Sequence, residues 1–167
     1  MYLPPKDLWP EIAPTEIDNE LRHRPVKGEV HDENAFAIGG VSGHAGVFST
    51  APDLADFCQM LLNGGIYAHH RILKRATIAE FTVPQPLAKN SRTLGWVVPT
   101  EGSSSGHYFS GHSYGHTGFT GTTIWIDPDR QLSITLLTNR TWPDGSNQAI
   151  KRVRPVFHDA IVGSLQT

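Results

Sequence analysis

The sequence has a single cysteine, no long apolar run and no excess of positive charge. One cysteine, Cys58, in 167 residues excludes an internal disulfide. No apolar stretch approaches the roughly 20 residues that a helix needs to cross a bilayer, and residues 1–7 lack the basic and apolar segments of a signal peptide. A net charge of -2 and a pI near 6.5 leave no basic surface for nucleic acid or an anionic membrane. The sequence therefore argues against a disulfide scaffold, a transmembrane protein and a nucleic-acid-binding protein.

What is present is an ordinary globular composition that is rich in turn-forming residues. The chain is 38% hydrophobic and 18% charged, and its length suits one domain with a sizeable core. Residues 1–34 carry prolines at five positions that forbid a long helix, so we expect an irregular segment with one short helical turn near residues 6–11: Pro4, Pro5, Pro10, Pro14 and Pro25.

Three segments are predicted to be helical. The first follows Ser49-Thr50-Ala51-Pro52-Asp53, a typical helix start, and its apolar positions recur at helical spacing: Leu54, Phe57, Cys58, Leu61 and Leu62. Cys58 is interpreted as a small buried hydrophobic residue rather than a reactive thiol. A second helix is expected at about residues 74–83. A last helix is expected at about 148–165, with a kink or a late start because Pro155 lies inside it.

Alternating apolar residues after position 122 predict a β-hairpin. Ile124 and Ile126 share one face of the first run, and Leu132, Ile134 and Leu136 share one face of the second. The runs are joined by Asp127-Pro128-Asp129-Arg130, which favours a tight turn, and both strands are expected to be half-buried. A further strand is predicted at residues 94–98. The fold class is therefore α+β, with an antiparallel sheet of three or so strands.

Two glycine-punctuated segments are candidate functional loops. His116-Thr117-Gly118 stands at the entrance to the hairpin, and residues 39–46 contain glycine at four of eight positions. The glycine-rich loop has neither the spacing of a phosphate-binding Walker motif nor the Lys-Ser/Thr that follows it. Phosphate binding is therefore not predicted.

Two segments of the sequence resemble those of a known family. Gly43-His-Ala-Gly-Val-Phe-Ser-Thr-Ala-Pro-Asp-Leu-Ala-Asp-Phe57 is similar to a stretch of the serine β-lactamase-like superfamily, which includes class C β-lactamases, penicillin-binding proteins, D-aminopeptidases and β-lactamase-like esterases. His116-Thr117-Gly118 resembles its third motif, and the hairpin and last helix resemble its C-terminal half. The resemblance covers essentially the whole chain. It implies a single partial domain, with a loop-rich and helical part at residues 1–92 and strands plus a C-terminal helix at 93–167.

The resemblance also implies a mechanism that needs residues absent from this sequence. In such enzymes a serine in Ser-x-x-Lys attacks the acyl carbon, and a Tyr-x-Asn or Ser-x-Asn motif relays protons. No serine in the sequence has lysine three residues later, and Tyr108-Phe109-Ser110 stands too close to the third motif to be the second one. We expect both motifs to lie upstream of Met1. The chain would then be the C-terminal portion of an acyl hydrolase, inactive alone; the alternative is a non-catalytic module that binds a ligand or a partner.

The resemblance assigns candidate roles to five residues. His116, Thr117 and Gly118 would contact a small-molecule acyl substrate or β-lactam, the backbone N–H of Phe119 would be one oxyanion donor, and His44 would line the pocket rim. An imidazole is mostly neutral at pH 7, so His116 predicts weaker carboxylate recognition than the lysine of many relatives provides. A histidine that only donates to backbone is the alternative for His116. No cofactor is implied, and no compartment is predicted, although complete relatives are often exported or periplasmic.

Several residues near these motifs have competing interpretations. Asp32 and Glu33 are assigned no catalytic role, since loop hydrogen bonds explain them as well. A zinc site is considered and rejected because the spacing of the following histidines matches no zinc signature: His31, His44, His107, His112 and His116. Finally, the strand at residues 132–138 would lack a neighbour without the upstream part of the fold. Such an open edge predicts a homodimer, an exchange of elements, or association with a separate N-terminal half.

Overall fold

The computed structural model describes residues 1–85 and 92–165. The chain forms two compact units, which are described separately. The first comprises residues 1–50, 119–121 and 138–150, and the second comprises residues 51–118, 122–137 and 151–167. Among the described residues, no helix is both long and apolar enough to cross a bilayer.

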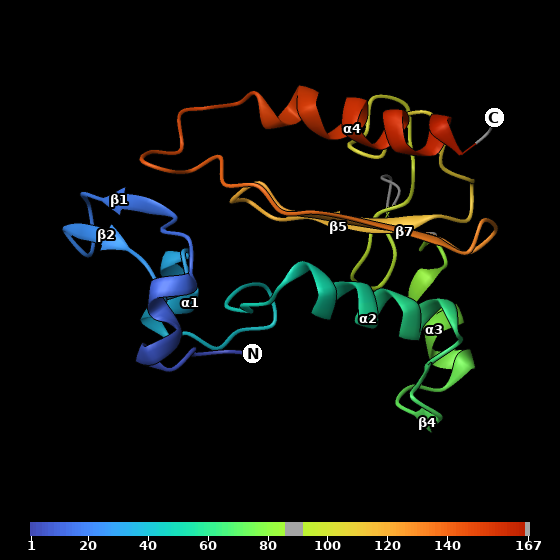
Figure 1. Ribbon diagram of the computed structural model, residues 1–167, viewed down its shortest axis with the longest axis horizontal. Helices are drawn as coiled ribbons and strands as arrows, with labels where there is room; N and C mark the ends of the chain where they lie inside the picture. Colours follow the sequence, from blue (N-terminus) through green and yellow to red (C-terminus); the bar gives the residue numbers. More distant parts are fainter. Residues whose placement is uncertain (86–91, 166–167) are drawn as a thin grey trace. The chain divides into compact units, whose positions relative to one another are not determined.

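The second unit is built on a three-stranded antiparallel sheet (Figure 1). Its strands are β5 (Tyr114–Thr117), β6 (Thr123–Asp127) and β7 (Leu132–Leu136), with β6 in the centre. The predicted hairpin is confirmed: β6 and β7 pair with Trp125 opposite Ile134. The antiparallel strands and separate helices confirm the predicted α+β class.

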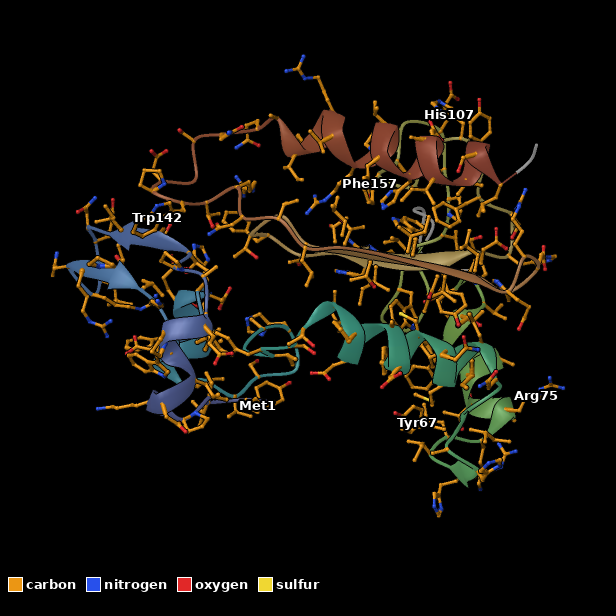
Figure 2. All side chains as sticks on the ribbon, viewed as in Figure 1. Met1, Tyr67, Arg75, His107, Trp142 and Phe157 are labelled. Carbon is orange, nitrogen blue, oxygen red and sulfur yellow. The ribbon has the colours of Figure 1, made fainter. Side chains whose placement is uncertain are left out.

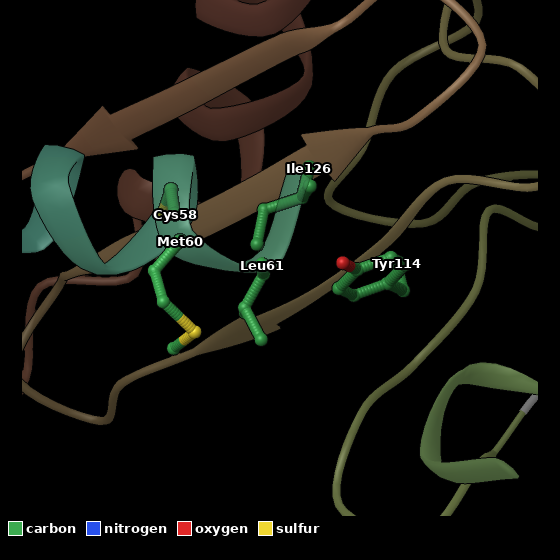
Figure 3. Packing of buried hydrophobic residues seen from close by; sticks show 5 residues of the cluster. All are labelled: Cys58, Met60, Leu61, Tyr114 and Ile126. Atoms are coloured by element: carbon green, nitrogen blue, oxygen red, sulfur yellow. The ribbon is translucent and has the colours of Figure 1, made fainter. Parts of the chain in front are cut away.

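Helices cover both faces of this sheet. Figure 1 shows α4 (Ile150–Ser164) along one face and α2 (Ala51–Leu62) along the other. On the α2 face lies a buried cluster, drawn in Figure 3: Cys58, Met60, Leu61, Tyr114 and Ile126. On the α4 face lies a second cluster, against which Phe157 packs (Figure 2): Phe109, Trp125, Ile134 and Val162. The expectation of a half-buried strand is therefore wrong for β6, because α4 covers the face that was expected to be open.

The helices otherwise follow the predicted segments with local differences. On α2, Cys58 is buried as expected, and burial raises the pKa of its thiol. Phe57, by contrast, is 40% exposed, and Met60 occupies the core in its place. A short hairpin of β3 (Ile66–Tyr67) and β4 (His70–Arg71) leads to α3 (Arg75–Thr82). The last helix spans Ile150–Ser164, within the expected segment of about 148–165, and Pro155 lies inside it.

The predicted strand at residues 94–98 does not form. Only Val97 pairs there, through single bridges to Arg92 and to Gly115 of β5. The reason is Gly95, whose φ of 112° lies outside the extended region that a strand needs.

The first unit contains a short hairpin where an irregular segment was expected. It includes a 3-10 helix, η1 (Lys6–Glu11), which was predicted, and the strands β1 (Glu16–Asp18) and β2 (Arg24–Val26), which pair antiparallel. The Asp18 carboxylate accepts hydrogen bonds from three backbone N–H groups of the connecting turn, first of all that of Leu21, and these lower its pKa. A short helix, α1 (Glu33–Ala37), follows. The sequence prediction failed here because Asp18 organises a turn that no alternation reveals.

Candidate active site

The His116-Thr117-Gly118 triplet ends strand β5 and begins the turn into β6. His116 lies opposite Ile124 and Thr117 opposite Thr123, so both belong to the strand that precedes the predicted hairpin. The Gly118 N–H donates to the Thr122 carbonyl at 2.8 Å and closes the turn. A Cβ atom at position 118 would meet the Thr122 hydroxyl, so a larger residue there would require the Thr122 side chain to rotate. The sheet thus fixes the triplet, although at the end of a strand rather than at its start.

Each ring nitrogen of His116 has a polar neighbour. Its Nδ1 lies 2.9 Å from the Thr117 carbonyl, which can only accept, so Nδ1 carries a proton. Its Nε2 lies 3.3 Å from Nη1 of Arg92, which can only donate, so Nε2 accepts. A guanidinium therefore stands beside His116, where the sequence pattern gave no sign of a fixed positive charge.

Phe119 follows the triplet directly and belongs to the first unit. The residue is 66% exposed, and its ring lies under the Arg140 guanidinium, with 4.2 Å from Cζ to the ring centroid. The ring stacks on His31 at a centroid distance of 5.4 Å, and Nε of Arg140 donates to the Phe119 carbonyl at 2.7 Å. Among residues 1–85 and 92–165, no acceptor is found for the Phe119 backbone N–H.

His44 is held in the first unit by two polar neighbours. Its Nδ1 lies 2.7 Å from the Ser42 hydroxyl, and its Nε2 lies 3.0 Å from Oδ1 of Asp32. Asp32 also accepts from the Ala35 N–H at the start of α1, and this bond together with His44 lowers the pKa of Asp32. A serine, a histidine and a carboxylate in contact resemble a hydrolytic triad in composition. The carboxylate, however, caps a helix and the serine is only two residues from the histidine, so loop organisation accounts for the cluster.

The remaining histidines of the rejected zinc site form separate pairs with carboxylates. His31 pairs with Glu16 at 3.1 Å, His107 with Asp159 at 2.7 Å and His112 with Asp129 at 2.8 Å. In the part of the chain that the structure describes, no group of three or more His, Cys, Asp or Glu side chains is suited to hold a metal ion.

Residues 4–155 match the Beta-lactamase family. The chain belongs to the β-lactamase family. It is 41% identical over 145 residues to proteins of Salmonella typhi and Salmonella newport (strain SL254), each named "Putative D-alanyl-D-alanine carboxypeptidase". The aligned part is 78% of this chain and 33% of each relative, so the chain spans about a third of the length of the curated relatives it matches.

Two solved structures show the same fold. A β-lactamase from Mycobacterium bovis superposes with a TM-score of 0.59 at 23% identity, over 74% of this chain and 47% of that one. A penicillin-binding protein homolog from Caulobacter crescentus gives a TM-score of 0.50 at 19% identity, over 68% and 32% of the two chains. The recognition of a partial β-lactamase-like domain from the sequence is thus confirmed.

In this family member, the predicted site residues fall into two groups. The triplet lies in the second unit, and Phe119 and His44 lie in the first. A cavity of about 300 Å³ in the second unit has Leu61, Ile78 and Tyr114 among its lining residues, and the described lining includes no residue of the triplet. Burial raises the pKa of Tyr114 to about 12, so its hydroxyl stays protonated. Nothing connects this cavity with the predicted chemistry.

Asp127 is a structural residue whose importance the sequence did not reveal. Its fully buried carboxylate accepts from the backbone N–H and hydroxyl of Ser110 and from the Arg130 guanidinium at 2.8–3.0 Å. Burial acts to raise the pKa of Asp127, but the bonds from Ser110 and Arg130 outweigh it and hold the pKa below its ordinary value. The Ser110 hydroxyl also contacts that of Ser113, which directly precedes β5. Asp127 therefore anchors the loop that leads into the triplet strand.

We expect Asp127→Asn to lower the free energy of unfolding by about 2 kcal/mol at pH 7, since hydrogen bonds to a charged group are lost. Because the folded-state pKa lies below the unfolded value of about 3.9, the carboxylate stabilises the fold at neutral pH. This stabilisation is lost as the pH falls from about 5 through the folded-state pKa. Urea denaturation between pH 3 and 7 measures the difference, with Asp7→Asn as the exposed control. A difference from the wild type that stays constant over this range would contradict the assignment.

Proposed function

We propose that this chain supplies the substrate-binding and oxyanion wall of an acyl-serine hydrolase. His116, Thr117 and Gly118 contact the substrate, and the Phe119 N–H donates to the oxyanion. The observation that carries the proposal is the state of the Gly118–Phe119 peptide. Its carbonyl is bonded within the protein, whereas its N–H, directly after the triplet, has no acceptor in the described part of the chain. An N–H held in this way is ready to bind a developing negative charge.

The nucleophile of this hydrolase comes from a segment outside the chain. The 167-residue sequence contains no Ser-x-x-Lys motif. The curated relatives are about three times as long as the part that aligns with this chain. We use the term complemented hydrolase for this chain joined to, or co-expressed with, a segment that carries Ser-x-x-Lys. The second candidate function is a non-catalytic ligand- or partner-binding module, and covalent labelling separates the two.

The chain alone is expected to show no covalent labelling by a fluorescent penicillin or a fluorophosphonate, and the complemented hydrolase is expected to be labelled on the added segment. Mass spectrometry of the labelled peptide locates the modified serine. Ser42→Ala is the control, because Ser42 contacts His44, and His44 in turn contacts the carboxylate of Asp32. Labelling of the chain alone that disappears in this variant would contradict the assignment of the nucleophile to another segment. A complemented protein that binds penicillin without being labelled would favour the non-catalytic module.

We further propose that the substrates are acyl compounds of the ester, β-lactam or D-amino-acid peptide class, with uncharged esters turned over well. An imidazole carries no fixed charge for a carboxylate, unlike the lysine of many relatives, and Arg92 beside His116 is a cation that a carboxylate would meet. In the complemented hydrolase, Arg92→Gln is expected to lower kcat/KM for penicillin about tenfold, the loss of one charge-assisted hydrogen bond, and to leave a short-chain aryl ester unchanged. Assays of both substrates from pH 5.5 to 8 provide the measurement. A wild-type preference for penicillin that Arg92→Gln leaves unchanged would contradict the proposal.

Two earlier assignments stay predictions. His44 is proposed as a rim residue that binds substrate. His44→Gln is therefore expected to raise KM in the complemented hydrolase.

The chain alone is proposed to dimerise through β7, which pairs only with β6 among the described strands and leaves its other edge open. Light scattering at tens of micromolar measures this, and a sharp monomer with cooperative unfolding would contradict it.

A further inference from the structure

Arg154 reaches from α4 to the turn that follows the triplet. It is 9% exposed, and its Nη2 donates to the Gly118 carbonyl at 2.7 Å and to the Thr122 carbonyl at 2.9 Å. The Thr122 carbonyl also accepts from the Gly118 N–H at 2.8 Å. The turn is therefore closed by one backbone hydrogen bond and held by a charged donor that binds both of its ends.

The Gly118 carbonyl and the Phe119 N–H are parts of the same peptide group. Because that group is planar and trans, its C=O and N–H bonds point in opposite directions and rotate together. A guanidinium on the oxygen thus sets the direction of the N–H without touching it. Charge-assisted hydrogen bonds are about twice as strong as neutral ones, so rotation of this peptide plane costs more than in an ordinary turn. Binding at the oxygen also polarises the peptide and makes its N–H a better donor.

We propose that Arg154 is a positioning residue for oxyanion stabilisation, which holds the Gly118–Phe119 peptide plane so that the Phe119 N–H faces the reacting acyl group. The inference rests on the proposed function, which makes this N–H an oxyanion donor. Arg154 itself does not touch the substrate. A purely structural role, in which Arg154 only ties α4 to the sheet, would change stability without changing the orientation or mobility of this one peptide in the folded protein.

The first experiment is nuclear magnetic resonance on the isotope-labelled chain. In Arg154→Gln we expect the Gly118 carbonyl carbon to shift and the Phe119 amide to gain slow exchange broadening. Arg154→Lys, which keeps the charge but can hold the two carbonyls less rigidly, is expected to give an intermediate change. Arg152→Gln, on the same helix but exposed, is the matched control and should resemble the wild type. Unchanged Gly118 and Phe119 signals in folded Arg154→Gln would overturn the inference.

A measurement on the wild type covers the case in which Arg154→Gln does not fold. A guanidinium held by two carbonyls rotates slowly, so separate and slowly exchanging Nη proton signals are expected for Arg154 and not for Arg152. A single averaged, rapidly exchanging signal for Arg154 would overturn the inference equally.

The second experiment measures kinetics in the complemented hydrolase. Arg154→Lys is expected to lower kcat about tenfold, with KM changed less than twofold, because misalignment of an oxyanion donor affects the transition state more than the bound substrate. Arg152→Gln should leave both constants unchanged. If the Phe119 amide changes in the variant and kcat does not, the oxyanion role of Phe119 fails along with the catalytic part of this inference. If the Phe119 amide signal does not change in the Arg154 variants, Arg154 does not position this peptide, and the inference is wrong even if the proposed function is right.

Discussion

Phe119→Pro in the complemented hydrolase is expected to lower kcat by about 10²–10³-fold, the cost of losing one oxyanion donor. Proline has no backbone N–H, so the substitution removes the proposed donor itself. In the described part of the chain that N–H donates to no acceptor, and the fold therefore loses no hydrogen bond. The measurement is kcat and KM with an aryl ester, together with the unfolding transition of the variant.

Phe119→Ala is the matched control for this prediction. It removes the exposed ring and its stacking on His31 and Arg140, but it keeps the N–H. We expect kcat to fall only a few-fold. Equal losses in the two variants would show that the ring, and not the backbone N–H, is what matters at this position, and the oxyanion assignment would then be wrong.

Trp125→Ala is expected to lower the free energy of unfolding by about 3–5 kcal/mol, the range for truncating a large buried aromatic side chain. Trp125 is fully buried in the central strand and contacts Phe109 at a centroid distance of 5.6 Å. It packs in the α4-face cluster together with Ile134 and Val162. The cavity left by the substitution would lie between the sheet and α4, the helix that also carries Arg154. Urea denaturation followed by circular dichroism measures the change.

Two variants control the tryptophan prediction. Trp142→Ala removes the same side chain from a position that is 42% exposed, and it is expected to cost about 1 kcal/mol or less. Trp125→Phe keeps an aromatic ring in the core and should fall between the other two. Similar losses for Trp125→Ala and Trp142→Ala would mean that the α4 face of the sheet is not a packed core.

The elements that could be predicted are those that local sequence specifies. Ile124 and Ile126 alternate with Trp125, and this pattern gave the β6–β7 hairpin and placed its two faces correctly, because side chains on a strand alternate strictly. The start of α2 was visible for a similar local reason. In contrast, the first-unit hairpin was missed because the carboxylate of Asp18, and not an apolar pattern, organises its turn. The exposure of Phe57 and the burial of Met60 depended on which helix face met the sheet.

The candidate site was predictable only where it is contiguous in sequence. His116, Thr117, Gly118 and Phe119 form one short segment and were found together. The two arginines that donate hydrogen bonds to this segment come from distant positions. Arg92 is 24 residues before His116, and Arg154 is 36 residues after Gly118. Neither stands in a motif, since a single arginine on an irregular segment or a helix has no distinguishing pattern.

The sequence by itself determined the family, the hairpin, the main helices and the triplet, because each is written in residues close enough along the chain to form a pattern. Only the tertiary structure decided that β6 is buried on both faces, that His116 accepts a hydrogen bond from Arg92, and that Arg154 binds the Gly118 carbonyl. The physical reason is that hydrogen-bond geometry and burial depend on which distant segments meet. A motif identifies the candidate groups for the chemistry. The contacts with the rest of the fold determine which charges lie beside these groups and how the groups are oriented.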